Sequence, residues 1–206
     1  MNEIQERAGH ADLRVVRGDR TRRTITRHAA DVASLEGLSG LSIGRLATDL
    51  DMSKSSVATL FGTKEKLQLA TVEAARHAFL DEVVRPVPDT PHGAERVRAL
   101  TERWIAYATA PLFPGGCFWA ANLPDFDSRP GPVRDALARQ RRDWQALLTD
   151  ELRHAVEAGQ IAPVDADLAA FQIDAVLLAT NTALRLGETE AADKARQVVA
   201  GFLTPG

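Results

Sequence analysis

The segment from Ile43 to Phe61 constrains the fold most, because its apolar residues have the spacing of two short helices that cross at a tight turn. Ala47 falls where the two helices would approach most closely, and a larger side chain there would push them apart. Asp51 falls in the turn, where a left-handed backbone is usual and where Asp is better tolerated than most residues other than Gly. The residues expected between the helices are Leu46, Leu50, Met52, Val57 and Leu60. The segment predicts a helix-turn-helix, although an ordinary helical hairpin has a similar pattern.

The other side chains on the second helix of this motif are short or positively charged: Lys54, Ser55, Ser56, Ala58 and Thr59. A helix with such a face can enter the major groove of DNA and touch base edges and phosphates. Upstream lies a cluster of arginines with Asp19 as the one acid between its first and last members: Arg14, Arg17, Arg20, Arg22, Arg23 and Arg27. Such a cluster can neutralise phosphates, but a solvated tail has the same composition.

Helical periodicity continues through the rest of the chain, and the strict alternation typical of strands is nearly absent. The predicted helices cover residues 21–35, 43–50, 54–61, 64–85, 94–109, 117–122, 133–158, 165–186 and 190–203. Prolines and glycines predict loops before residue 94, around Pro111 to Gly116, and from Asp125 to Pro132. The sequence therefore predicts an all-α fold of about nine helices.

Composition narrows the setting in which the chain is expected to act. Its 206 residues suit one or two domains. The sequence has no apolar run of about 18 residues, as a membrane span would need, and Met1 to Arg20 lacks the apolar stretch of a signal peptide. Cys117 is the one cysteine, so an intrachain disulfide is impossible. These features predict a cytoplasmic protein with no membrane partner.

Residues 21–69 resemble the DNA-binding domain of the TetR family of transcriptional regulators. The resemblance lies in an Arg-rich first helix, Ala29-Ala30, Gly37, Ser42-Ile43, Leu46-Ala47 and Met52-Ser53-Lys54. Its most specific part is the run Phe61-Gly-Thr-Lys-Glu-Lys-Leu67, directly after the second helix of the motif. In length and helical content the remainder of the chain is also similar to the family.

The resemblance implies roles for particular residues. Lys64 would contact a phosphate at the start of its helix, where free backbone amides also favour an anion, and Ser42 would do the same at another helix. The expected DNA-contacting residues are Arg23, Ser42, Lys54, Ser55, Ser56, Ala58, Thr59, Thr63 and Lys64. Two positions depart from the family pattern. Ala58 stands where an aromatic residue, often Tyr, is usual, and Asp51 replaces the usual Gly.

The resemblance also implies a homodimer, in which the last two helices form a four-helix bundle with a second copy. Both helices carry a broad apolar face in agreement with this expectation: Leu168, Phe171, Ala175, Leu178, Ala179, Thr182 and Leu186 on one, and Ala195, Val198, Val199 and Phe202 on the other. A two-fold protein would read double-stranded DNA as an inverted-repeat operator with half-sites about one helical turn apart.

Aromatic residues gather in the middle of the chain: Trp104, Tyr107, Phe113, Phe118, Trp119, Phe126 and Trp144. The breaks at Pro111 and Pro114 would leave space beside them for a small apolar or amphipathic effector. The residues expected to bind it are Trp104, Tyr107, Phe113, Cys117, Phe118, Asn122, Trp144 and Phe171. For any one of these residues, plain core packing is the alternative. For Cys117, the alternatives are a buried packing residue and a redox sensor.

Enzyme readings find little support in the sequence. Glu151 and His154 have the spacing of half a carboxylate di-iron site, but the second copy is missing, and no phosphate-binding loop or nucleophile elbow is present. We expect no catalytic residue, metal or cofactor.

The predicted organisation is a flexible N-terminal arm (residues 1–19), a DNA-binding domain (20–66) and a ligand-binding and dimerisation domain (67–206). The predicted function is a repressor that a ligand releases from DNA; the alternative is a helical adaptor or small-molecule-binding protein without a DNA function.

Overall fold

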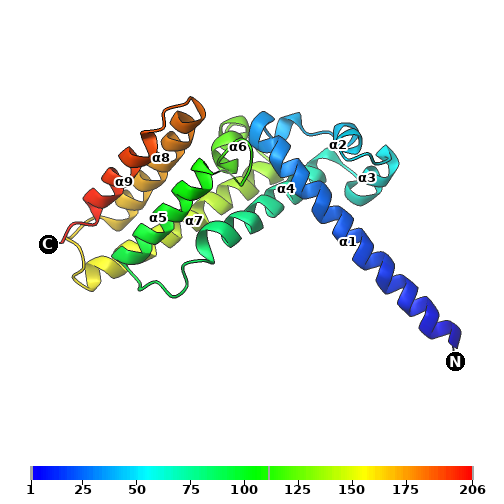
Figure 1. Cartoon of the computed structure of the whole chain (residues 1–206), viewed down its shortest axis with the longest axis horizontal. Helices are drawn as coiled ribbons and strands as arrows, with labels where there is room; N and C mark the ends of the chain where they lie inside the picture. The colour runs from blue at the N-terminus through cyan, green and yellow to red at the C-terminus, as the bar shows by residue number, and fades with distance from the viewer. Residues whose placement is uncertain (1, 111, 206) are drawn as a thin grey trace.

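The computed structural model describes residues 2–110 and 112–205, with side chains from residue 18 onward, and this part of the chain is all helical (Figure 1). The α-helices are α1 (Asn2–Glu36), α2 (Ile43–Asp49), α3 (Lys54–Phe61), α4 (Lys64–Phe79), α5 (Ala94–Thr109), α6 (Phe118–Phe126), α7 (Pro132–Glu157), α8 (Ala166–Arg185) and α9 (Ala191–Phe202). A short 3-10 helix, η1 (Leu38–Gly40), follows α1, and a π-helical turn, η2 (Leu80–Val84), continues α4. The predicted all-α class is confirmed. No helix in the described ranges is long and apolar enough to cross a lipid bilayer.

Helix α1 begins much earlier than the sequence suggested, at Asn2 rather than near Thr21. Most of the predicted N-terminal arm is therefore helical, while Met1 and the side chains of Arg14 and Arg17 lie outside the described residues. The arm contains no proline, and Gly9 and Gly18 weaken a helix by only about 1 kcal/mol each, which does not end it.

The helix-turn-helix forms as the local sequence predicts. Leu50 closes α2, and Asp51 follows with a φ of 51°, the one positive φ at a non-glycine residue in the described part of the chain. The amide of Asp51 donates to the Thr48 carbonyl (3.2 Å) and that of Met52 to the Ala47 carbonyl (2.8 Å), which is the Schellman pattern at a helix end. Ser53 then caps α3 by accepting a hydrogen bond from the Ser56 amide. The predicted left-handed turn at Asp51 is confirmed.

Ala47 is almost fully buried between α2 and α3, next to the cluster that contains Leu46 and Val57. We therefore expect Ala47→Leu to overpack the crossing and to lower the free energy of unfolding by about 1–3 kcal/mol. Urea unfolding measures the loss. Ala146→Leu is the matched control, because Ala146 is exposed on α7 and a surface change there should stay within about 0.5 kcal/mol. Equal stability of the two variants would contradict the assigned register.

The larger part of the molecule is a bundle in which α7 packs against α4, α5, α6 and α8, and α9 packs against α5 and α8 (Figure 1). Its buried apolar residues are continuous with those between α1, α2 and α3. Viewed in Figure 1, α2 and α3 lie at one end of the molecule, and α8 and α9 lie at the other. The two faces expected to meet DNA and a second copy are therefore far apart.

Helix α6 differs from its predicted extent, because it continues through Pro124 to Phe126 instead of ending near Asn122. A proline inside a helix removes one backbone hydrogen bond and normally bends or ends it. Here tertiary contacts hold the last turn: Phe126 is buried, and the Ser39 hydroxyl donates a hydrogen bond to the Asp125 carboxylate.

Candidate functional site

The outward face of α3 carries the short polar side chains expected at a DNA interface. Lys54, Ser55, Ser56 and Thr59 are exposed, and Ala58 is half-buried. The hydroxyl of Thr59 donates to the carbonyl of Ser55 on the same helix (2.8 Å), so its side chain lies close to the helix surface. At Ala58 a methyl group replaces the aromatic side chain usual in the family, and no long side chain projects from the middle of α3. The outward face of α3 therefore carries short, mostly polar side chains.

Three of the other expected contact residues stand at helix starts. The hydroxyls of Ser42 and Thr63 accept hydrogen bonds from the Arg45 and Lys66 amides, so they cap α2 and α4. Lys64, in the first turn of α4, donates from Nζ to the Ser39 carbonyl (2.5 Å). This bond holds its ammonium group against η1, beside the start of α4. Arg23 is exposed on α1.

Two acidic groups beside α2, Glu36 and Asp49, accept hydrogen bonds from basic side chains. Glu36 accepts hydrogen bonds from both terminal nitrogens of Arg45, and this contact lowers the pKa of the Glu36 carboxyl. Asp49 accepts a hydrogen bond from His28 Nε2 (3.0 Å), which lowers the pKa of its carboxyl with help from Arg45. Both carboxylates are thus stabilised in their ionised form, and the guanidinium of Arg45, which lies beside both, offsets part of their repulsion of a phosphate backbone.

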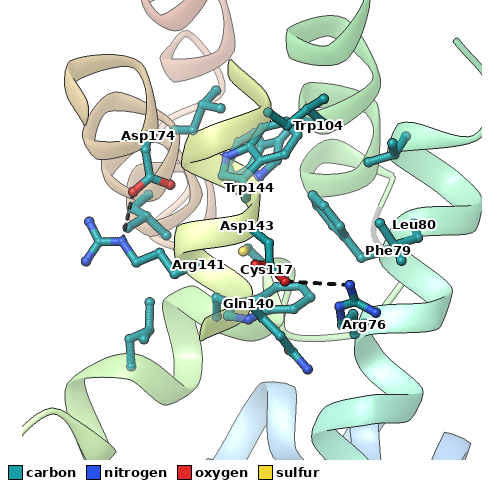
Figure 2. Close-up of a pocket in the computed structure, with 16 residues that line it drawn as sticks. Arg76, Phe79, Leu80, Trp104, Cys117, Gln140, Arg141, Asp143, Trp144 and Asp174 are labelled. Atoms are coloured by element: carbon teal, nitrogen blue, oxygen red, sulfur yellow. Dashed lines mark hydrogen bonds and ion pairs between the residues drawn. The ribbon is translucent and has the colours of Figure 1, made fainter. Parts of the chain in front are cut away.

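A cavity lies inside the larger bundle, between α4, η2, α5, α6, α7 and α8 (Figure 2). It encloses about 80 Å³ and is mainly apolar. The residues that line it are Arg76, Phe79, Leu80, Val84, Trp104, Cys117, Trp119, Leu123, Gln140, Arg141, Asp143, Trp144, Leu147, Asp174, Leu177 and Leu178. Helix α4 widens into its π-helical turn beside the cavity, where Leu80 and Val84 face it, and such turns often occur at functional sites.

Phe79 is the centre of the aromatic packing in this wall. Its ring meets the rings of Tyr107, Trp119 and Trp144 edge to face, at centroid distances of 5.4, 5.1 and 5.4 Å. Phe79 was not among the predicted ligand-binding residues, because it lies upstream of the aromatic-rich region from Trp104 to Trp144. Trp119 was part of the aromatic-rich region but not of the candidate set. Its position two residues after Cys117 was the signal available for it.

Of the eight residues expected to bind a ligand, Trp104, Cys117 and Trp144 line the cavity. Tyr107, Phe113 and Phe118 lie in the buried core around it, where the Phe118 amide donates to the Tyr107 hydroxyl (2.9 Å). Phe113 packs under the Arg27 guanidinium, 4.9 Å from the ring centroid. Pro111, the predicted helix break, lies outside the described residues.

Asn122 and Phe171 lie away from the cavity for different reasons. Asn122 is fully buried and joins α6 to α1 and η1: it accepts from the Leu38 amide (2.7 Å) and donates to the Ala33 carbonyl (3.2 Å) and the Phe118 carbonyl (2.7 Å). Its amide group therefore connects two parts of the fold. Phe171 is 56% exposed, because it lies on the side of α8 opposite the buried Ala169 and Ile173.

The charged residues of the cavity form two ion pairs (Figure 2). Arg76 lies 3.6 Å from Asp143, and Arg141 donates from Nε to Asp174 at 2.9 Å. Gln145 also donates to Asp174. Burial raises the pKa of the Asp174 carboxyl, and the guanidinium of Arg141 opposes that shift. The cavity therefore has a balanced charge.

Cys117 is poorly suited to redox sensing, because its surroundings disfavour the thiolate. Burial raises the pKa of the Cys117 thiol to about 11, from an ordinary value of 9.0. At pH 8 only about one thiol in 1,000 would then be ionised, compared with about one in ten after unfolding.

We expect Cys117 in the folded protein to react with an aromatic disulfide reagent at least about 100 times more slowly at pH 8 than in urea-unfolded protein, since the thiolate is the reactive form. The rate should rise as the pH approaches 11, because the raised pKa delays ionisation to that range. Absorbance of the released thiolate measures it. Fast stoichiometric reaction of the folded protein at pH 8 would instead favour a redox role.

The Glu151–His154 motif has a structural explanation. Glu151 is buried, and its carboxylate accepts hydrogen bonds from His92 Nδ1 (2.9 Å) and from the Gly93 amide (2.9 Å), which ties the loop before α5 to α7. Within the described residues, no three His, Cys, Asp or Glu side chains are arranged to hold a metal ion.

Comparison with known proteins identifies the class. A family model described as the C-terminal domain of tetracycline-repressor-like proteins matches residues 93–199, just over half of the chain. The protein belongs to the TetR family of transcriptional regulators. Regulators of this family are transcription factors and not enzymes. No curated protein matches the sequence significantly.

Solved structures support the same fold. A TetR transcriptional regulator from Chloroflexus aurantiacus superposes with a TM-score of 0.83 at 22% identity, over 90% of this chain and 95% of that one. A putative transcriptional regulator from Saccharomonospora viridis in complex with choline has a TM-score of 0.74 at 22% identity, over 89% and 95% of the two chains. AibR in complex with isovaleryl coenzyme A and operator DNA has a TM-score of 0.70 at 21% identity, over 90% and 99%. At these identities the likeness establishes the fold alone.

Proposed function

We propose that the protein is a repressor that binds an inverted-repeat operator as a homodimer and leaves the DNA when a small molecule occupies the cavity. Residues 20–66 would form the DNA-binding domain and residues 67–206 the ligand-binding and dimerisation domain. The observation that carries the proposal is the helix-turn-helix itself: α3 is anchored by buried Val57 and Phe61 and presents Lys54, Ser55 and Ser56 to solvent. A helix held in this way suits insertion into a major groove.

The proposed homodimer rests on α8 and α9. Large apolar side chains on these helices are exposed in the single chain: Leu168 (53%), Phe171 (56%), Leu186 (75%) and Val198 (40%). Such a concentration of exposed apolar residues is typical of an interaction surface. A second copy packed on this face would bury them and would set the distance between the two α3 helices, which an inverted repeat requires.

The proposed release mechanism rests on contacts that join the cavity walls to the DNA-binding part. Helix α6 contributes Trp119 and Leu123 to the cavity and Asn122 and Asp125 to α1 and η1. Helix α4 contributes Phe79 and also starts beside α3. A ligand that binds better when α4 and α6 are displaced would favour a conformer with a different α3 spacing, with a coupling of about 1–3 kcal/mol. AibR and the Saccharomonospora viridis regulator, which have the same fold, have been solved in complex with small molecules, and this supports a small-molecule ligand for the present protein.

Lys64→Ala provides the test of DNA docking. If Lys64 contacts a phosphate, its removal should weaken binding to all sequences about equally and reduce the slope of log affinity against log salt by about 1, since one fewer counterion is released. The measurement is fluorescence anisotropy of duplexes selected from the DNA beside the gene, over a range of salt concentrations.

The control is Arg139→Ala, which removes a positive charge from an exposed position on α7, outside the proposed dimer face, and should leave affinity and salt slope unchanged. Should Lys64→Ala behave like the control, the proposed docking would be wrong. If the unaltered protein binds no duplex at all, the adaptor interpretation replaces the repressor.

A further inference from the structure

Arg22 on α1 holds the end of α3 through two contacts. Its Nη1 donates a hydrogen bond to the Leu60 carbonyl (2.8 Å). Its guanidinium group also lies over the Phe61 ring, 4.6 Å from the ring centroid. Leu60 and Phe61 are the last two residues of α3. Both contacts therefore fix the C-terminal end of the helix that we propose to enter the major groove.

The hydrogen bond meets a general need of a helix end. The last four carbonyls of an α-helix have no partner within the helix. At the end of α3, the Phe61 carbonyl accepts a hydrogen bond from the Thr63 amide (2.8 Å), and the Leu60 carbonyl accepts one from Arg22. A positive charge at the C-terminal end is also favourable for the helix dipole. Arg22 thus contributes to the capping of α3.

Helix α3 depends on such contacts because it is short. It has eight residues, of which Val57 and Phe61 are buried. A helix of this length has little stability of its own and is held by tertiary packing. Val57 anchors its first half and Phe61 anchors its end, where the guanidinium of Arg22 covers the ring. The direction of α3 relative to the rest of the protein therefore depends on the contacts of Arg22.

Helix α1 is itself fixed to the larger bundle by a contact of the same kind. Arg27, five residues after Arg22, donates from Nη2 to the Leu112 carbonyl (2.7 Å), and its guanidinium lies over the ring of the buried Phe113. Each of these two arginines thus contacts an aromatic ring and the carbonyl of the residue before it. Through Arg22, α3 is attached to a helix whose own place is set by the bundle.

We propose that Arg22 is a positioning residue for DNA recognition, which sets the direction of α3 toward the base edges and does not itself contact a phosphate. This inference rests on the proposed function, because it takes α3 as the helix that enters the major groove. Arg22 is half-buried, whereas its neighbours Arg20 and Arg23 are exposed. Base contacts specify a sequence and phosphate contacts do not. Loss of a positioning residue should therefore reduce discrimination between sequences.

Arg22→Gln tests the proposal in the full-length protein. Fluorescence anisotropy compares a selected operator duplex with a scrambled duplex of the same length and composition, over a range of salt concentrations. We expect operator affinity to fall about tenfold or more, since a hydrogen bond from a charged group and a cation–π contact are both removed. Affinity for the scrambled duplex should stay within about twofold, with the same salt slope. Equal weakening on both duplexes, with a slope lower by about 1, would identify a phosphate contact and overturn the proposal.

Two further variants separate the contact from the charge. Arg20→Gln removes the same charge from an exposed position two residues earlier, and should leave the ratio of operator to scrambled affinity unchanged. Arg22→Lys keeps the charge but lacks the planar guanidinium group, so its ratio should stay closer to that of Arg22→Gln than to that of the unaltered protein. Full rescue by lysine, or an equal loss of the ratio in Arg20→Gln, would overturn the proposal.

Hydrogen–deuterium exchange without DNA shows whether Arg22 holds α3, independently of any operator. Arg22→Gln should speed exchange of the Leu60 and Phe61 amides about fivefold or more, because this helix end opens more often, while amides of α7 keep their rates. Unchanged exchange at the end of α3 would overturn the proposal. If the unaltered protein binds no duplex, the proposed function fails, and the exchange rates still decide whether Arg22 fixes the helix.

Discussion

Phe171→Arg should convert the protein from a dimer to a monomer and lower its affinity for an inverted-repeat operator at least about 100-fold, because the two half-sites would then be bound separately. Phe171 is 56% exposed on α8, in the middle of the proposed dimer face. In a two-fold interface the same surface meets itself, so the new charge would be removed from water close to its own copy. Sedimentation analysis measures the oligomeric state, and fluorescence anisotropy with a selected operator duplex measures affinity.

Two controls separate this effect from damage to the fold. Phe171→Leu keeps the position apolar and should preserve the dimer. Ala106→Arg places the same charge at an exposed position on α5, outside the proposed interface, and should also preserve it. A dimer that survives Phe171→Arg with unchanged operator affinity would show that α8 does not form the interface.

Gly115→Ala should destabilise the protein by about 3 kcal/mol or more, at the upper end of overpacking effects. A Cβ atom at this position would lie 1.8 Å from the Ser34 carbonyl oxygen and 2.3 Å from its carbon. Both are backbone atoms of α1, so the segment before α6 would have to move away from that helix. The hydrogen bond from the Gly115 amide to the Ser34 hydroxyl (2.9 Å) would then be lost. Urea unfolding measures the change.

Gly18→Ala is the matched control, because Gly18 lies within α1 and nothing stands within 4 Å of the position of its added Cβ. Alanine favours a helix over glycine, so stability should stay equal or rise slightly. If Gly115→Ala is folded and as stable as the control, the close contact between α1 and the α5–α6 segment is not required. A folded but destabilised protein with altered ligand response would place this contact in the coupling between cavity and DNA.

Several features of the molecule are contained in short stretches of sequence. The turn at Asp51 needs only a residue that tolerates φ > 0 and the carbonyls of Ala47 and Thr48, all within five residues. The caps at Ser42 and Thr63 each use an amide three residues ahead. Local periodicity therefore predicted the limits of α3 and α5 as observed, and those of α2, α7, α8 and α9 to within about one residue.

The chain by itself also determined the family, since the motif from Phe61 to Leu67 is compact and specific, and it determined which helices carry apolar faces. Tertiary structure decided which side chains line the cavity. Periodicity gives the face of a helix but not its rotation against neighbours far away in sequence, and the Asn122 amide meets the Leu38 backbone across 84 residues. The same packing turns Phe79 inward, keeps Phe171 outside, and leaves Trp119 Nε1 and Gln140 Oε1 buried without a hydrogen-bond partner among the described residues. Such pairings depend on how several helices pack together, which no single stretch of sequence encodes.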